Sequence, residues 1–151
     1  MTFMELAAAR YSVRKFKPDP VAPELITKIL EAGRLSPTAH NGQPQRIKVI
    51  SDEEGLKKLD DCSPCRYGAP AVMIVCADTS GSFKRPDGMD SGIIDASIVM
   101  THMILQAEES GVNSCWVLFF DADKLRAAFD LPENKFDLEN LKFGTNFTNE
   151  Q

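Results

Sequence analysis

The stretch Arg34-Leu-Ser-Pro-Thr-Ala-His-Asn-Gly-Gln-Pro44 decides how the rest of the chain is interpreted. An apolar-periodic helix runs into it, and Pro37 stops that helix because proline has no N–H to donate and clashes with the preceding turn. Between Pro37 and Pro44 most side chains are short, absent or amides, which leaves backbone uncovered. Such a surface suits a flat heteroaromatic ligand with donors and acceptors on its edge. A plain helix-to-strand loop has the same composition.

A second stretch, Arg10-Tyr-Ser-Val-Arg-Lys-Phe16, follows a short N-terminal helix. Arg10, Ser12 and Arg14 alternate, so in extended backbone two guanidinium groups and a hydroxyl point to one side. Arginine forks and a hydroxyl suit a phosphate, to which charge-assisted hydrogen bonds are strong. The alternative interpretation is a solvated basic face.

Together the two stretches resemble the nitroreductase family of FMN-dependent oxidoreductases. The resemblance runs from about Met4 to Pro132 and includes four further blocks in the family's order: Gly68–Val75, Asp90–Ser97, Gly111–Trp116 and Leu131–Asn134. It implies an α+β fold in which a mainly antiparallel central sheet is flanked by helices, one of them long, central and buried. We expect a single domain over residues 1–151, with an atypical segment after about residue 134.

The resemblance also assigns roles to residues, all of them in binding FMN. Arg10 and Ser12 would hold the phosphate with Tyr11 between them, and Arg14 would reach the ribityl chain or the N1 end of the ring. Arg66 is a weaker candidate for the N1 side. The ring itself would be contacted from the other subunit by Pro37, Thr38, Ala39 and Asn41.

The implied reaction is a ping-pong transfer. NAD(P)H would reduce the flavin at N5 and leave, and a nitroaromatic, quinone or enone would take its place. The sequence contains no Ser-His-Asp set, Gly-x-Ser-x-Gly motif, metal-spaced histidines or P-loop, which fits an enzyme whose cofactor carries the chemistry. Two alternatives stay open: a flavin-binding or storage protein with little turnover, and a non-catalytic dimeric interaction module.

Composition indicates which classes of partner and which compartment to expect. The 151 residues carry a formal net charge of -5 with 26% charged residues, so a nucleic-acid partner is not expected. The longest apolar stretch, residues 93–107, is interrupted by Asp95, His102 and Gln106, so no membrane span is expected. We therefore expect a cytoplasmic protein.

Four cysteines are present. Cys76 and Cys115 lie in apolar strand patterns and are expected in the core. Cys62-Ser-Pro-Cys65 could be a zinc half-site, a redox pair or two incidental cysteines. Zinc needs further ligands, and neither His40 nor His102 has a useful spacing, so no metal is expected. The incidental interpretation is favoured.

Periodicity and end signals predict helices over residues 2–9, 52–59 and 90–110, one that begins at Pro23, and one that is capped by Asp121 or Asp123 and reaches Phe129. Strands are predicted over 46–50, 71–77 and 115–120. The helix over 90–110 is apolar on nearly all sides, which places His102 in the core and predicts packing against both the sheet and a second subunit of a homodimer. The alternative is the central helix of a monomer.

The last residues depart from the family, which usually continues with a strand and a basic tail. Here the segment 138–143 is at best a weak strand, and no basic residue follows Lys142. We therefore expect one sheet strand to be shortened or lost, 138–143 to cover the exposed sheet edge, and the residues from Thr145 onward to be loosely ordered. Part of the charge that neutralises the phosphate would be missing, so FMN binding should be weaker and salt-sensitive.

Overall fold

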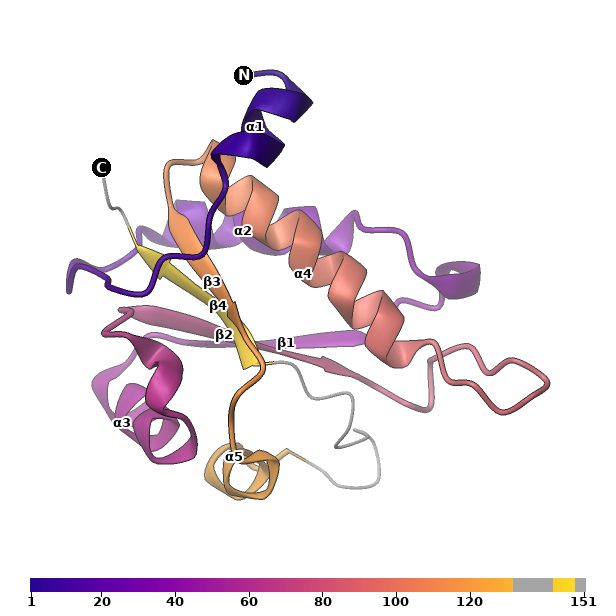
Figure 1. The fold of residues 1–151 in the computed structure, drawn as a ribbon. Coiled ribbons are helices and arrows are strands. Elements are labelled where there is room, and N and C mark those ends of the chain that lie inside the picture. The colour runs from indigo at the N-terminus through magenta and orange to yellow at the C-terminus, as the bar shows by residue number, and fades with distance from the viewer. Residues whose placement is uncertain (132–142, 149–151) are drawn as a thin grey trace.

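The computed structural model describes residues 1–131 and, for the backbone, residues 143–148. Within these residues the chain forms a four-stranded antiparallel sheet in the order β1-β2-β4-β3 (Figure 1). The strands are β1 (Gln45–Ile50), β2 (Ala71–Ala77), β3 (Asn113–Val117) and β4 (Phe143–Thr148). β2 is paired on both sides and all of its residues are buried, which confirms the predicted central strand.

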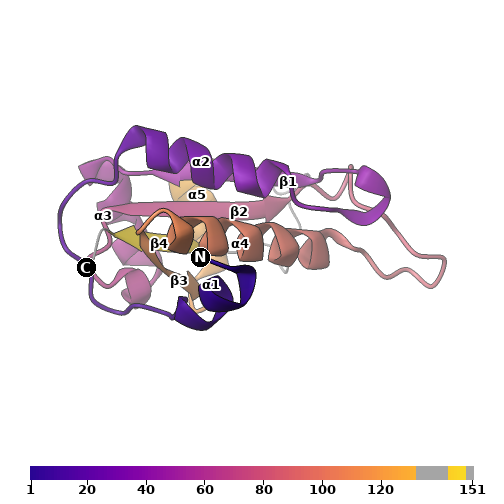
Figure 2. The same cartoon turned by 90° about the horizontal axis from the view of Figure 1, so that it is seen from above.

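Helices cover both faces of this sheet (Figures 1 and 2). α2 and α4 lie on one face, and α3 and α5 lie on the other. The helices are α1 (Phe3–Ala9), α2 (Pro23–Arg34), α3 (Glu53–Cys62), α4 (Gly92–Glu109) and α5 (Ala122–Phe129), with short 3-10 turns η1 (Ala39–Asn41) and η2 (Pro64–Arg66). The expected α+β class with a long helix across the sheet is confirmed.

Side-chain alternation along β2 divides the core into two layers. Its odd-numbered residues, such as Met73, pack with α2 and α4, and its even-numbered residues, such as Ile74, pack with α3 and α5. Both side chains are fully buried, and burial of one such side chain contributes about 1.5 to 3 kcal/mol. A continuous valine-rich run is what a strand covered on both faces requires.

The helix ends follow local signals in the sequence. Thr2 and Glu5 form the predicted capping box of α1, with reciprocal side-chain to backbone bonds. Pro23 occupies the first turn of α2, and α2 ends at Arg34, before the proline that prevents its continuation. Asp121 caps α5 by accepting from the Lys124 N–H at 3.1 Å.

α4 is buried on the side that faces the sheet and exposed on the other. Ile93 and Ile94 keep 36% and 49% of their surface exposed. His102 is also exposed, with Nδ1 3.0 Å from the Ile98 carbonyl, so its expected place in the core is wrong. The described chain covers only the sheet-facing side of α4, and His102 lies on the other. No described helix is long and apolar enough to cross a bilayer.

The C-terminal strand corrects the expectation for the tail. β4 begins at Phe143 and includes Thr145 to Thr148, and it pairs with β2 on one side and β3 on the other. A strand is therefore present inside the sheet, and Thr145 to Thr148 form part of it. Most of the segment expected to cover an edge, residues 138–142, lies outside the described residues. β2 and β3 run parallel, so an antiparallel strand fits between them; β4 pairs with Ala71 and Val72 at the start of β2 and with residues 113–117 of β3.

Candidate functional site: two segments at opposite ends of α4

The segment from Arg10 to Phe16 is extended and fixed along the start of β3. The Val13 N–H donates to the Ser114 carbonyl at 3.1 Å, and Ser12 and Ser114 form a parallel bridge. The Phe16 N–H donates to the Tyr67 carbonyl at 3.2 Å. Val13 and Phe16 are buried, whereas Tyr11, Arg14 and Lys15 are exposed, so burial does not alternate strictly along the segment. A common face for Arg10, Ser12 and Arg14 stays a prediction.

Arg10 and Arg14 are cations without a carboxylate partner among the described residues. Arg14 is exposed, and its Nη1 lies 3.4 Å from the Ser12 carbonyl. Four other arginines are paired: Arg34 with Glu31, Arg46 with Asp78, Arg66 with Asp60 and Arg85 with Asp87. Two available guanidinium groups beside a hydroxyl make a donor set that fits a phosphate.

Arg14 also lies close to a group of partly buried thiols. Burial raises the pKa of the Cys115 thiol, while the Arg14 charge and the Ser12 hydroxyl act in the opposite direction. The pKa of Tyr67 is raised, chiefly by its hydrogen bond with Cys65. Tyr11 is 58% exposed on the outer side of the segment. The segment therefore rests on β3 and the loop before β2, with its polar groups outward.

The second predicted segment, Pro37 to Asn41, is anchored at its centre. The Ala39 N–H donates to Asp95 Oδ1 at 2.8 Å, and the Gln43 N–H donates to Thr38 Oγ1 at 3.0 Å. Pro37 and Asn41 are exposed. The loop is thus held by a hydrogen bond to α4, while Pro37 and Asn41 remain exposed on its outer surface.

Three residues of this loop adopt the left-handed conformation that L-residues rarely take: His40 (φ 43°), Asn41 (φ 58°) and Gln43 (φ 46°). Each costs on the order of 1 to 3 kcal/mol, and such strain persists only where surrounding contacts enforce it. The Gln43 side-chain amide donates to Asn41 Oδ1 at 3.1 Å on the exposed side. A strained, anchored loop with exposed amides supports a binding role for this segment.

One protomer does not bring the two segments together. Arg10 follows α1, which packs against the C-terminal half of α4, whereas Ala39 is bonded to the N-terminal turn of α4 (Figures 1 and 2). α4 has 18 residues, and at about 1.5 Å per residue it is roughly 27 Å long. The two segments therefore lie at opposite ends of the long helix.

Arg66 has a different environment from the other predicted residues. Its Nε and Nη2 each donate to the Asp60 carboxylate at 2.6 Å, and its Nη1 donates to the Ala69 carbonyl at 2.9 Å. These bonds turn the guanidinium toward α3. Its role at the N1 side of a flavin stays a prediction.

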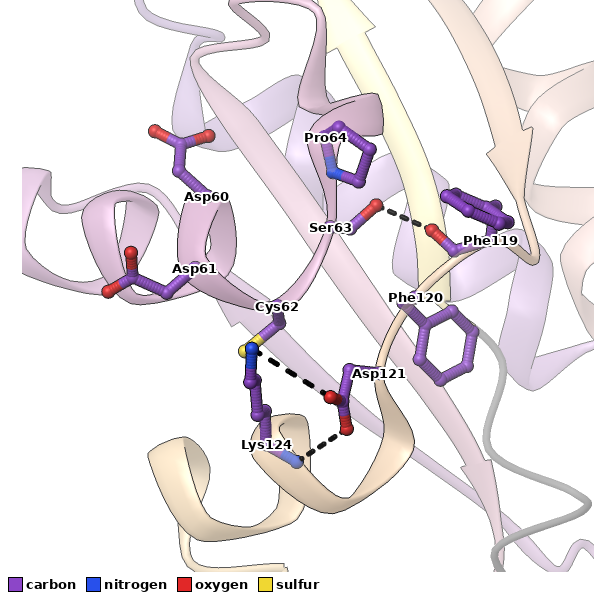
Figure 3. Close-up of a pocket in the computed structure, with 9 residues that line it drawn as sticks. All are labelled: Asp60, Asp61, Cys62, Ser63, Pro64, Phe119, Phe120, Asp121 and Lys124. Atoms are coloured by element: carbon purple, nitrogen blue, oxygen red, sulfur yellow. Dashed lines mark hydrogen bonds and ion pairs between the residues drawn. The ribbon is translucent and has the colours of Figure 1, made fainter.

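A hollow of about 490 Å³ lies elsewhere, between the C-terminal end of α3 and the start of α5 (Figure 3). Asp60, Asp61 and Asp121 lie along it with Phe119, whose side chain is 72% exposed. Its lining includes no predicted FMN residue, and its three carboxylates outnumber the one ammonium group of Lys124, which disfavours a phosphate. The hollow therefore does not fit the predicted cofactor.

Cys62 lines the same hollow, but its thiol points back to α3 and donates to the Lys58 carbonyl at 3.1 Å. Cys62 and Cys65 do not form a disulfide, and no cluster of potential metal ligands occurs among the described residues.

Asp95 is the site residue that sequence reasoning missed. The sequence predicts no site role for it, yet it is 2% exposed and holds the Pro37–Asn41 loop. The available signal was an acid in the first turn of an otherwise apolar helix, where the helix dipole favours negative charge.

Comparisons with known proteins point to one family. The model of the nitroreductase family matches residues 7–67 and 62–139. A relative from Archaeoglobus fulgidus, provisionally named NADH dehydrogenase/NAD(P)H nitroreductase, is 31% identical over 138 residues, which cover 87% of this chain and 78% of the relative.

Solved structures give the same result. A nitroreductase family protein from Clostridium difficile 630 superposes with a TM-score of 0.90 at 40% identity, covering 100% of this chain and 86% of that one. A protein described as an FMN-dependent nitroreductase from Clostridium difficile R20291 has a TM-score of 0.79 at 24% identity, covering 99% and 89%, which supports the fold.

Proposed function

The chain belongs to the nitroreductase family, and on that premise we propose that it is an FMN-dependent oxidoreductase that takes electrons from NAD(P)H and passes them to a nitroaromatic, quinone or enone. The observation that carries the proposal is the extended segment with Arg10, Ser12 and Arg14, whose two guanidinium groups have no carboxylate partner among the described residues. The likeness to the FMN-dependent nitroreductase from Clostridium difficile R20291 supports the cofactor.

Bound FMN would supply hydride and electron transfer at its N5 atom, and the protein would supply position and electrostatics. Arg10 and Ser12 would hold the phosphate, where each charge-assisted hydrogen bond contributes about 1.5 to 3 kcal/mol. Arg14 would place a positive charge toward the ribityl chain and the N1 end of the ring. A fixed cation there stabilises negative charge that develops during reaction.

The ring would be contacted by Pro37, Thr38, Ala39 and Asn41 of the second subunit. Their loop is strained, anchored to α4 and open on its outer surface. Short side chains allow a flat ring to approach the backbone, and the exposed Asn41 amide offers both a donor and an acceptor.

A homodimer is part of this proposal because the two segments lie at opposite ends of α4 in one chain. α4 leaves Ile93 and Ile94 exposed, and α1 beside it leaves Phe3 and Met4 at 68% and 74% exposure. A second copy that covers these side chains could bring its Pro37–Asn41 loop toward Arg10 and Arg14. We also propose that residues 1–151 form a single domain and that the protein is cytoplasmic.

Steady-state kinetics test the reaction. The protein loaded with FMN should oxidise NADH or NADPH in the presence of menadione or nitrofurazone. Double-reciprocal plots at several acceptor concentrations should be parallel, because one open site would serve donor and acceptor in turn. Intersecting lines would contradict the ping-pong order, and FMN binding without NAD(P)H oxidation would favour the storage role.

A further inference from the structure

A buried carboxylate joins two segments that are distant in sequence. Asp95 Oδ1 accepts from the Ala39 N–H at 2.8 Å, and Asp95 Oδ2 accepts from the Ser91 hydroxyl at 2.7 Å. Ser91 is 4% exposed and Asp95 is 2% exposed. A buried carboxylate is costly unless its oxygens are bonded, and here each oxygen serves a different segment. The start of α4 also favours its negative charge.

We define residues 79–91 as the arm. Hydrogen bonds of Ser91 extend the connection from Asp95 to this arm. The arm projects beyond the N-terminal end of α4, on the same side as η1 (Figures 1 and 2). The Ser91 hydroxyl accepts from the Phe83 N–H at 3.2 Å, and the Ser91 N–H donates to the Phe83 carbonyl at 2.9 Å. A continuous series of hydrogen bonds therefore runs from Ala39 through Asp95 and Ser91 to Phe83.

The loop and the arm also touch directly. The His40 and Phe83 rings meet edge to face, with centroids 5.6 Å apart and an interplanar angle of 72°. At Gly42, an added Cβ would lie 2.7 Å from the Gly81 carbonyl oxygen. Backbone thus approaches backbone too closely for any side chain at this position. Phe83 remains 40% exposed, so the ring pair is open on its outer side.

We propose that Asp95 is a positioning residue that holds the Pro37–Asn41 loop against the arm, so that His40 and Phe83 form an aromatic wall for flat acceptors. This inference rests on the proposed function, because it assigns the wall to the mouth of the proposed flavin site. His40 and Phe83 would contact the acceptor, whereas Asp95 acts through Ala39 and Ser91. The wall favours aromatic acceptors, since ring pairs gain stability from offset or edge-to-face contact.

Asp95→Asn tests the inference because it keeps the shape but removes the buried charge, and the amide nitrogen can no longer accept from the Ser91 hydroxyl. The matched control is Asp52→Asn: Asp52 accepts from the Gly55 N–H at 2.8 Å at the start of α3, away from the loop. Each variant, loaded with FMN, is assayed with menadione, a flat quinone, and with ferricyanide, an inorganic acceptor that needs no aromatic wall.

For Asp95→Asn, kcat/KM for menadione should fall by about tenfold, or about 1.4 kcal/mol, while kcat/KM for ferricyanide changes less than about twofold. Phe83→Leu should give the same selective loss, and Asp52→Asn should change neither value. Ser91→Ala provides a milder second variant if Asp95→Asn does not fold, and it should show the same selectivity.

The failures are distinguishable. Equal losses for both acceptors, or no loss for either, in an active Asp95→Asn or Ser91→Ala protein would overturn the positioning role. A wild-type protein that neither binds FMN nor reduces either acceptor would overturn the proposed function itself.

Discussion

The Val13 N–H donates to the Ser114 carbonyl at 3.1 Å, and this bond holds the N-terminal segment in register with β3. The same bond fixes the backbone between Ser12, which is half-buried, and Arg14, which is exposed. The phosphate site proposed for this chain is therefore attached to the sheet and not to a free terminus.

Replacing Arg10 or Arg14 with alanine should weaken FMN binding. Loss of a charge-assisted hydrogen bond should cost about 1.5 to 3 kcal/mol for either variant, measured by fluorescence titration of FMN. Lys17→Ala is the matched control, since Lys17 is an exposed cation just beyond the same segment. The wild-type affinity should also fall as salt rises. If Arg10→Ala, Arg14→Ala and Lys17→Ala all bind FMN as tightly as the wild type, the arginines do not hold the phosphate and the interpretation as a solvated basic face is favoured.

Ile94→Asp should separate the proposed homodimer. The Ile94 side chain is 49% exposed on the outer face of α4, and a carboxylate buried there between two copies would lack a partner. Light scattering at micromolar concentration should report the mass of a dimer for the wild type and for Ile94→Val, and that of a monomer for Ile94→Asp. A wild-type monomer would remove the proposed two-chain site.

Deleting residues 143–151 should destabilise the fold, whereas deleting only 149–151 should not. The longer deletion removes β4, which pairs with β2 and β3, so two ladders of backbone groups would lose their partners. Thermal unfolding of the two deletions and the full chain is the measurement. The same melting temperature for all three would show that β4 adds no stability to the sheet.

Stability should decline at alkaline pH through Cys76. Burial raises the pKa of its thiol from 9.0 to about 12, so above pH 9 the unfolded chain releases a proton that the folded chain retains. The contribution of Cys76 to the free energy of unfolding is therefore complete below pH 9 and is lost as pH rises toward 12. Urea unfolding between pH 8 and pH 11 should show a smaller decline for Cys76→Ala. An equal decline in the free energy of unfolding of the wild type and of Cys76→Ala would show that other groups cause the effect.

Much of the fold could be predicted because its signals are local. The valine-rich run of β2, the Thr2 capping box and Pro23 each specify their element without knowledge of its neighbours. β4 could not be placed in the same way. Its sequence, Phe-Gly-Thr-Asn-Phe-Thr, has only weak strand character, and its position depends on the space between β2 and β3.

The candidate site likewise has a part that local sequence signals predict and a part that they do not. Alternation predicted a common face for Arg10, Ser12 and Arg14; the structure leaves Arg14 exposed and Arg10 and Ser12 half-buried, and their common role stays a prediction. The bond from Ala39 to Asp95 spans 56 positions of sequence, and no local pattern reports it. The separation of the two segments by α4 is likewise a property of the folded chain alone.

A complementation experiment tests the two-chain flavin site most directly. Heterodimers with different affinity tags are purified in two arrangements: Arg10→Ala/Arg14→Ala in one chain and Thr38→Ala/Asn41→Ala in the other, or all four changes in one chain beside a wild-type chain. If each site takes its phosphate segment from one chain and its loop from the other, the first arrangement keeps one intact site, with about half of wild-type NAD(P)H oxidation, and the second keeps none. Activity in the second arrangement and not in the first would place the whole site in one chain and contradict the account.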